Sequence, residues 1–125
     1  MKVFGLLIAL ASANVFAANK YYEIGMNLSV DGERIPAPRI LVKKNVTETV
    51  IQGNRFFEVT ATENPKDQSV KMDFAMGEFT EDGRRVITSR PTIISKENTR
   101  AEMKITGEDG SEKMNLSVIP IVKEL

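Results

Sequence analysis

Hydrophobic and polar residues alternate along three long segments of the chain. From Tyr22 to Val30 every second residue is apolar, and the residues between are small or polar. The same period-two pattern returns in residues 70–76 and in residues 114–122 near the C-terminus. Side chains of a strand point alternately to its two faces, so this pattern predicts strands with one buried face.

Six shorter strand-like segments are found at residues 39–43, 46–52, 55–62, 84–89, 92–95 and 100–106. No window has the 3.6-residue apolar spacing of an amphipathic helix. Asp-Gly pairs at 31–32, 82–83 and 109–110 are typical of tight hairpins. Pro36 and Pro38 cannot donate to a ladder, which predicts a sheet edge or a crossing between sheets there. We expect an all-β protein, an antiparallel β-sandwich of about eight or nine strands.

Two halves of the chain, residues 21–62 and 69–122, share a pattern that predicts an internal duplication. Residues 31–35 match residues 82–86, and Arg39 matches Arg90. After Pro91, taken as one inserted residue, residues 40–44 fall on residues 92–96. The polar residues 63–69 would link the halves. Recurring turns of an all-β chain are the alternative explanation. Separately, Met-Asn-Leu-Ser-Val occurs at residues 26–30 and again at residues 114–118.

The N-terminus has the layout of a secretory signal peptide. Lys2 precedes an apolar stretch over residues 3–13, and Val15 and Ala17 form a small-residue cleavage pattern. We expect residues 1–17 to be removed, leaving a single domain of residues 18–125. The alternative is a buried N-terminal helix. The expected compartment is the periplasm, with full secretion left open and no integral membrane segment after cleavage.

Composition excludes several classes of chemistry. The chain has no Cys and no His, so Ser-His-Asp or Cys-His catalysis, disulfides and imidazole or thiolate zinc sites are ruled out. Its 17 basic and 17 acidic residues give a net charge of zero. This balance argues against nucleic acid or an anionic membrane as a partner.

Carboxylates and methionines have structural explanations. The acidic clusters at residues 78–82 and 108–112 are expected at solvated hairpin turns, although a carboxylate pair could serve a hydrolase. The methionines at positions 26, 72, 76, 103 and 114 fall on predicted inward faces. They are expected in the core rather than at a copper site. We therefore predict no catalytic residue, no metal and no cofactor.

Basic and aromatic residues provide the candidate binding residues. Basic residues recur at similar places in the two halves: Arg34, Arg39, Lys43, Lys44, Arg84, Arg85 and Arg90. Converging, they would form a cationic patch for a carboxylate, a phosphate or an acidic strand. Otherwise they protect sheet edges through pairing with Glu33, Glu48 and Glu81. One residue of each aromatic doublet must point away from the core, which makes Tyr21 and Phe56 candidates for exposed contacts.

The segments Ala37-Pro38-Arg39-Ile40-Leu41-Val42 and Ser89-Arg90-Pro91-Thr92-Ile93-Ile94 carry a family resemblance. With the Asp-Gly turns before them they resemble part of the C-terminal β-domain of bacterial secretins, over residues 31–62 and 82–106. The chain departs from that family because it has no upstream periplasmic repeats and is too short to contribute a pore wall. The resemblance implies a soluble relative of the β-unit, and transfers no function.

The sequence as a whole predicts an exported, non-enzymatic β-sandwich that binds a protein partner. It would act as an accessory subunit of a bacterial envelope assembly, by strand-edge or sheet-face contact. The candidate edges are residues 35–42 and residues 86–94. A carboxylate-based hydrolase and a periplasmic carrier of a small ligand or metal are the alternatives.

Overall fold

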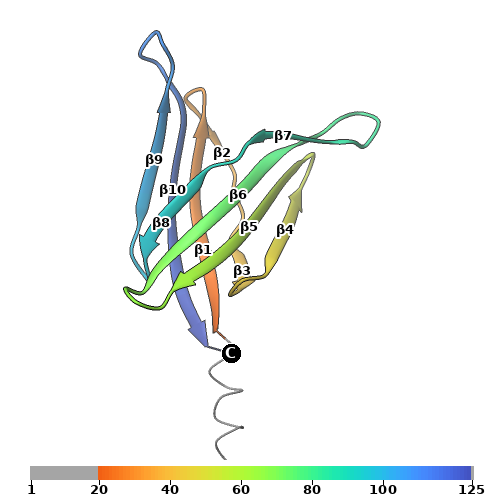
Figure 1. The fold of residues 1–125 in the computed structure, drawn as a ribbon. Coiled ribbons are helices and arrows are strands. Elements are labelled where there is room, and N and C mark those ends of the chain that lie inside the picture. Colours follow the sequence, from red (N-terminus) through yellow and green to blue (C-terminus); the bar gives the residue numbers. More distant parts are fainter. Residues whose placement is uncertain (1–19, 125) are drawn as a thin grey trace, which may run out of the picture.

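The computed structural model describes residues 20–124, so the expected signal peptide lies outside the described part of the chain. Ten strands form two antiparallel sheets of five strands each, packed as a β-sandwich (Figure 1). The first sheet contains β1 (Lys20–Val30), β2 (Glu33–Ile35), β3 (Ile40–Lys43), β9 (Ala101–Thr106) and β10 (Glu112–Glu124). The second contains β4 (Thr47–Gln52), β5 (Arg55–Asn64), β6 (Ser69–Phe79), β7 (Arg85–Ser89) and β8 (Thr92–Lys96). The expected all-β sandwich is confirmed, with more strands than expected because short β2 pairs with β1 separately from β3.

The central strands of the two sheets, β1 and β6, have matching neighbours. β1 pairs with β10 on one side and with β2 and β3 in succession on the other. β6 pairs with β5 on one side and with β7 and β8 in succession on the other. β9 and β4 lie at the edges beyond β10 and β5. The two sheets therefore have the same plan when β1–β5 are set against β6–β10.

The turns after β3 and β8 follow the same correspondence. Asn45 and Asn98 both have positive φ, at 67° and 60°. The N–H of Asn45 donates to the carbonyl of Ala61 at 2.8 Å, and that of Asn98 donates to the carbonyl of Pro120 at 2.7 Å. These features are what a duplicated chain would have, and the duplication itself stays a prediction.

In β3 and β8, the strand pairings align the two halves one residue away from the alignment that the sequence match gave. Ile40, which lies opposite Ile24, is the first buried residue of β3. Ile93, which lies opposite Met72, is the first buried residue of β8. The sequence match instead set Ile40 on Thr92.

Residues 63–69 connect the two sets of strands, β1–β5 and β6–β10. They span the hairpin turn from β5 to β6, which pair along ten positions from Arg55↔Glu78 to Asn64↔Ser69. Each sheet is built from strands of both halves, so the chain forms one core. The expected link between the halves is therefore a tight hairpin turn within one domain.

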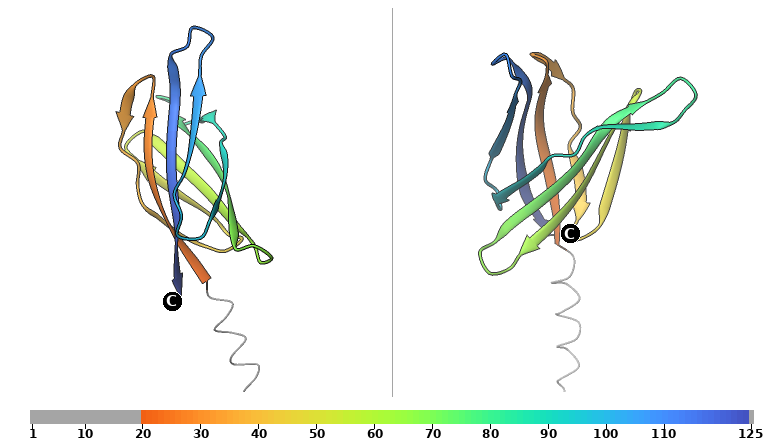
Figure 2. Two further views of the ribbon diagram at one scale, coloured as in Figure 1. Left: turned by 90° about the vertical axis from the view of Figure 1, so that its left-hand side faces the viewer. Right: turned by 45° about the horizontal axis from the view of Figure 1, so that its top comes forward.

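The core lies between the sheets and consists of the inward residues of the alternating strands. Fully buried members include Tyr22, Ile24, Val59, Val70 and Leu116. Four methionines are buried, and the fifth packs against the core, as expected: Met26, Met72, Met76 and Met114, with Met103 partly buried. The sheets diverge toward the upper end in Figure 1, where the β6–β7 hairpin projects from the body, and approach each other at the lower end (Figure 2).

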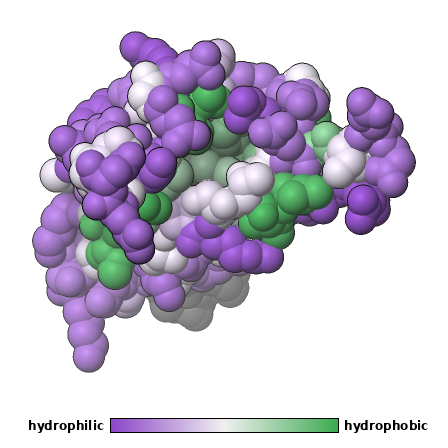
Figure 3. Space-filling model, turned by 90° about the horizontal axis from the view of Figure 1, so that it is seen from above, coloured by the Kyte–Doolittle hydropathy of each residue, from purple (hydrophilic) through white to green (hydrophobic). Residues whose placement is uncertain are grey.

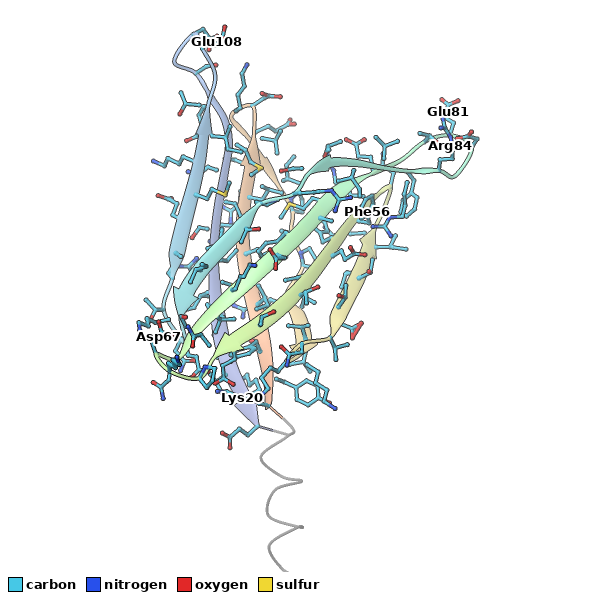
Figure 4. All side chains as sticks on the ribbon, viewed as in Figure 1. Lys20, Phe56, Asp67, Glu81, Arg84 and Glu108 are labelled. Atoms are coloured by element: carbon cyan, nitrogen blue, oxygen red, sulfur yellow. The ribbon has the colours of Figure 1, made fainter. Side chains whose placement is uncertain are left out.

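A polar cluster joins the sheets at the lower end, where Figure 4 labels Lys20. The Lys20 ammonium lies 2.6 Å from Glu63 and 2.5 Å from Glu97. Glu63 also pairs with Lys44 at 3.3 Å, and the Tyr22 hydroxyl donates to Glu97 at 2.8 Å. Burial disfavours the Lys20 ammonium, but its hydrogen bonds to Glu63 and Glu97 outweigh that effect and raise the pKa of Lys20. The hydrogen bond from Lys20 in turn lowers the pKa of Glu63.

Candidate binding surfaces

β7 is a free edge of the second sheet and belongs to the projecting hairpin (Figures 1 and 2). It pairs with β6 on one side, and no other strand within residues 20–124 pairs with it. Its adjacent residues Val86 and Ile87 are 43% and 37% exposed. Adjacent residues of a strand face opposite sides, so this edge carries apolar surface on both sides.

The open end of the core borders β7. Viewed from above, apolar surface gathers at the base of the projecting hairpin and in the hollow between the sheets (Figure 3). A cavity of about 40 Å³ lies there and is lined by core residues such as Phe57 and Met114. Thr88 and Ser89 of β7 also line it. The edge and the core opening are therefore neighbouring surfaces.

An apolar row, defined as Ile51, Phe56, Gly77 and Ile87, crosses the outer face of the second sheet. These residues are direct cross-strand partners on β4, β5, β6 and β7. Ile51 at one end is 63% exposed, and Ile87 at the other end lies on the free edge. Only the two ends of the row are exposed, because Phe56 and Gly77 between them are buried.

Phe56 is 0% exposed, so the expectation that it would be an exposed contact residue is wrong. It points away from the main core, as the doublet required, but its own neighbours cover it. The Arg85 guanidinium lies 4.2 Å from its ring centroid, and the Phe79 ring centroid lies 5.6 Å away. Gly77 lies beneath the ring, where a Cβ would come within 2.9 Å of Phe56 Cζ.

Other edges of the sandwich carry features that oppose strand addition. β4 presents Glu48 and β9 presents Glu102 and Lys104, all exposed. Charged residues on an edge disfavour pairing with another chain. The candidate edge at residues 35–42 is interrupted by Pro36 and Pro38 between β2 and β3. The candidate edge at residues 86–94 is also interrupted by a proline, Pro91, but it includes most of β7, a five-residue strand without proline.

A polar trough lies on the outer face of the first sheet. Its floor is formed by the repeated pentapeptide, because residues 26–30 of β1 pair antiparallel with residues 114–118 of β10. Asn27 is opposite Ser117 and Ser29 is opposite Asn115, which places four small polar side chains side by side. Two adjoining hollows of about 440 and 400 Å³ share Asn27, and together they make up the trough.

Three arginines line this trough and reach it from different elements. Arg34 of β2 donates from Nη2 to Asn27 Oδ1 at 3.3 Å. Arg100, just before β9, donates from Nη1 to Ser117 Oγ at 2.8 Å. Arg39 lies over Gly25 and pairs with Glu23 at 3.0 Å. We call this surface the arginine trough, defined by Gly25, Asn27, Ser29, Arg34, Arg39, Arg100, Asn115 and Ser117.

The structure divides the predicted cationic patch between the two sheets. Arg34 and Arg39 share the arginine trough. Arg85 lies on the second sheet and pairs with Glu58 at 3.3 Å, and exposed Arg90 follows β7. The basic residues of the two halves therefore do not converge, because corresponding strands belong to different sheets.

Tyr21 is partly exposed on the outer face of the first sheet, opposite Lys43 and Lys123.

Arg100 and the two pentapeptides, residues 26–30 and 114–118, were not among the site residues predicted from the sequence. The exact repeat of Met-Asn-Leu-Ser-Val was the available signal, since identical alternation allows two strands to present similar faces. Nothing in the sequence indicated that the repeats would be neighbours. That follows from the pairing of the first described strand with the last.

The acidic residues 81–82 and 108–109 lie in hairpin turns, as expected, whereas Glu78 and Glu112 lie in β6 and β10. Figure 4 labels Glu81 and Glu108 at the tips of two different hairpins. Hydrogen bonds from local partners lower the pKa values of Asp82 and Asp109, with Thr80 and Ser111 the leading donors. Within residues 20–124, no three His, Cys, Asp or Glu side chains come together in a way that could hold a metal ion.

Comparison with protein-family models, with curated proteins and with solved structures returns no match. In the described range 20–124 there is no helix of the length and hydrophobicity required to cross a membrane.

Proposed function

We propose that this protein is an exported, non-enzymatic β-sandwich that binds a protein partner at the β7 edge. The observation that carries this proposal is the free edge strand with Val86 and Ile87 exposed on its two sides. Natural proteins usually protect edge strands with charges, prolines or covering elements. An edge on a projecting hairpin with adjacent apolar residues, and with Arg85 as its one charged residue, is suited to contact with another chain.

Binding would occur by addition of an extended partner segment to β7. Main-chain hydrogen bonds to the unpaired side of β7 would supply affinity, and alternate side chains would supply specificity. One set of partner side chains would contact Ile87, and the other set would contact Val86. Arg85 above Phe56 would add a cation at the rim of this contact.

The proposed setting is the periplasm, with the protein as an accessory subunit of an envelope assembly. The signal-peptide pattern of residues 1–17 and the absence of Cys from the sequence support this setting. A chain without Cys needs no oxidative folding after export, because its stability derives from the packed core.

Capture from cross-linked bacterial envelopes tests the proposal, with tagged mature chains of residues 18–125. Ile87→Asp places a charge on the proposed contact, and Ile94→Asp is the matched control on β8 of the same sheet, where Ile94 is 63% exposed. We expect one abundant partner to be captured by the native chain and by Ile94→Asp but lost with Ile87→Asp. Equal capture by both variants would overturn the proposed edge.

A further inference from the structure

The arginine trough is a second surface, on the opposite sheet from β7. We propose that it binds an extended acidic segment of a polypeptide, through carboxylates that pair with Arg34 and Arg100. This inference concerns a different site from the proposed β7 contact and does not depend on it.

Arg34 and Arg100 approach one cross-strand pair from opposite edges of the first sheet. Arg34 hydrogen bonds to Asn27 and Arg100 to Ser117, and these two residues are direct partners on β1 and β10. A guanidinium has five N–H donors in a planar fork. Each of these bonds occupies one donor and fixes the side chain, so the remaining donors are oriented for bidentate carboxylate recognition.

Neither arginine has a carboxylate within 4.0 Å among residues 20–124. Six cationic side chains and three carboxylates project from this outer face: Arg34, Arg39, Lys43, Arg100, Lys104 and Lys123, against Glu23, Glu102 and Glu112. The Glu112 carboxylate accepts a hydrogen bond from Asn115 at 3.5 Å. The chain as a whole is neutral, so positive charge is concentrated on this sheet. Such a field attracts an acidic partner and orients it.

The outer face of the second sheet has no such excess. There Arg85 pairs with Glu58 at 3.3 Å, and Lys71 lies 3.9 Å from Asp73. The unbalanced charge is therefore a property of the outer face of the first sheet, where the trough lies, and not of both faces of the sandwich.

The floor of the trough favours a peptide over other anionic chains. Asn27 and Asn115 present amides, which donate and accept hydrogen bonds as a peptide backbone requires. The lining residues of the two hollows within 20–124 include no aromatic side chain on which a nucleic-acid base could stack. From Gly25 to Ser29 the floor measures about 13 Å, which matches roughly four residues of extended peptide.

Fluorescence anisotropy with a short labelled oligoglutamate peptide tests the proposal on the mature chain. The test variant is Arg34→Gln with Arg100→Gln, and the matched control is Arg84→Gln with Arg90→Gln, which removes the same charge elsewhere. Asn115→Asp is a second test variant, because it adds a carboxylate to the floor without a change of size. Thermal unfolding of each variant verifies that it is folded.

We expect both test variants to weaken oligoglutamate binding by at least about tenfold, and the control pair by less than about twofold. Ile87→Asp should leave this binding unchanged, so failure here is separable from failure of the β7 proposal. Equal losses in test and control pairs would overturn the inference, as would absence of binding by the native chain. Tighter trough-dependent binding of inorganic phosphate or of a single-stranded oligonucleotide would also overturn it.

Discussion

Lys20 of β1 and Glu63 of β5 lie 2.6 Å apart and connect the two sheets at the closed end of the sandwich. Glu63 also accepts a hydrogen bond from Lys44 at 3.3 Å. Two cations therefore hold its carboxylate, Lys20 from β1 and Lys44 from the turn after β3. Side-chain exposure is 20% for Lys20 and 13% for Glu63. A pair this sheltered is screened less than a surface pair and contributes to stability.

Glu63→Gln should reduce the free energy of unfolding at neutral pH by about 1–3 kcal/mol, because one partner of this sheltered pair is lost. The pKa of Glu63 is lowered in the folded state by the hydrogen bond from Lys20. Its contribution is therefore fully present above the unfolded-state pKa of about 4.3 and is lost as the pH falls through the lower folded-state pKa. Urea unfolding at neutral and acid pH measures both effects.

The control for this prediction is Glu48→Gln, because Glu48 is exposed and has no ion pair within residues 20–124. The Glu63→Gln protein should lose less stability on acidification than the native chain. If its stability fell in parallel with the native chain between neutral and acid pH, Glu63 would not be the responsible group.

Tyr22 should remain protonated as long as the protein is folded. Burial raises the pKa of its hydroxyl, and the hydrogen bond to Glu97 raises it further. The unfolded chain loses this proton near pH 10 while the folded chain keeps it, so stability falls as the pH rises above about 10.

Tyr21→Phe leaves Tyr22 as the single tyrosine, since the sequence contains two. In this variant the phenolate absorbance should rise only together with the loss of the folded circular dichroism signal. A phenolate signal that appears before unfolding would show that Tyr22 is accessible to solvent.

Gly77→Ala should destabilise the second sheet by at least about 2 kcal/mol through overpacking. A Cβ at this position would overlap the Val86 carbonyl oxygen and lie 2.9 Å from Phe56 Cζ. Gly25→Ala is the control, because its nearest contact would be Ile119 Cγ2 at 3.3 Å. Similar unfolding midpoints for the two variants in urea would contradict the close approach of β7 to β6.

Arg85→Ala should expose Phe56 and reduce stability by about 0.5–2 kcal/mol, because the guanidinium covers the aromatic ring and its stem contributes packing. Arg85→Lys retains the charge near Glu58 but lacks the planar group that lies over the ring. In thermal unfolding, we expect Arg85→Lys to be more stable than Arg85→Ala and less stable than the native chain. Full restoration would indicate that the ion pair alone is responsible.

Strands and turns were predictable because their signals are local. Period-two alternation identified the long strands, and the Asp-Gly turns occur as expected, with Gly32 and Gly83 at φ values of 78° and 86°. β2 was missed as a separate strand because Glu33–Ile35 is too short to show a period.

The binding surfaces were less predictable because they depend on which strands are neighbours. Phe56 has the expected direction but is covered by Arg85 and Phe79, two residues more than 20 positions away in sequence. Arg34 and Arg100 meet at one cross-strand pair only because β1 pairs with β10. A single sequence carries no local signal for contacts of this kind.

Amide hydrogen exchange of the captured complex tests the central claim, that a partner strand adds to β7. Residues 85–89 should gain protection on complex formation, while residues 47–52 of β4, the opposite edge of the same sheet, should exchange as in the free protein. Unchanged exchange in residues 85–89, with the partner bound, would contradict strand addition at this edge.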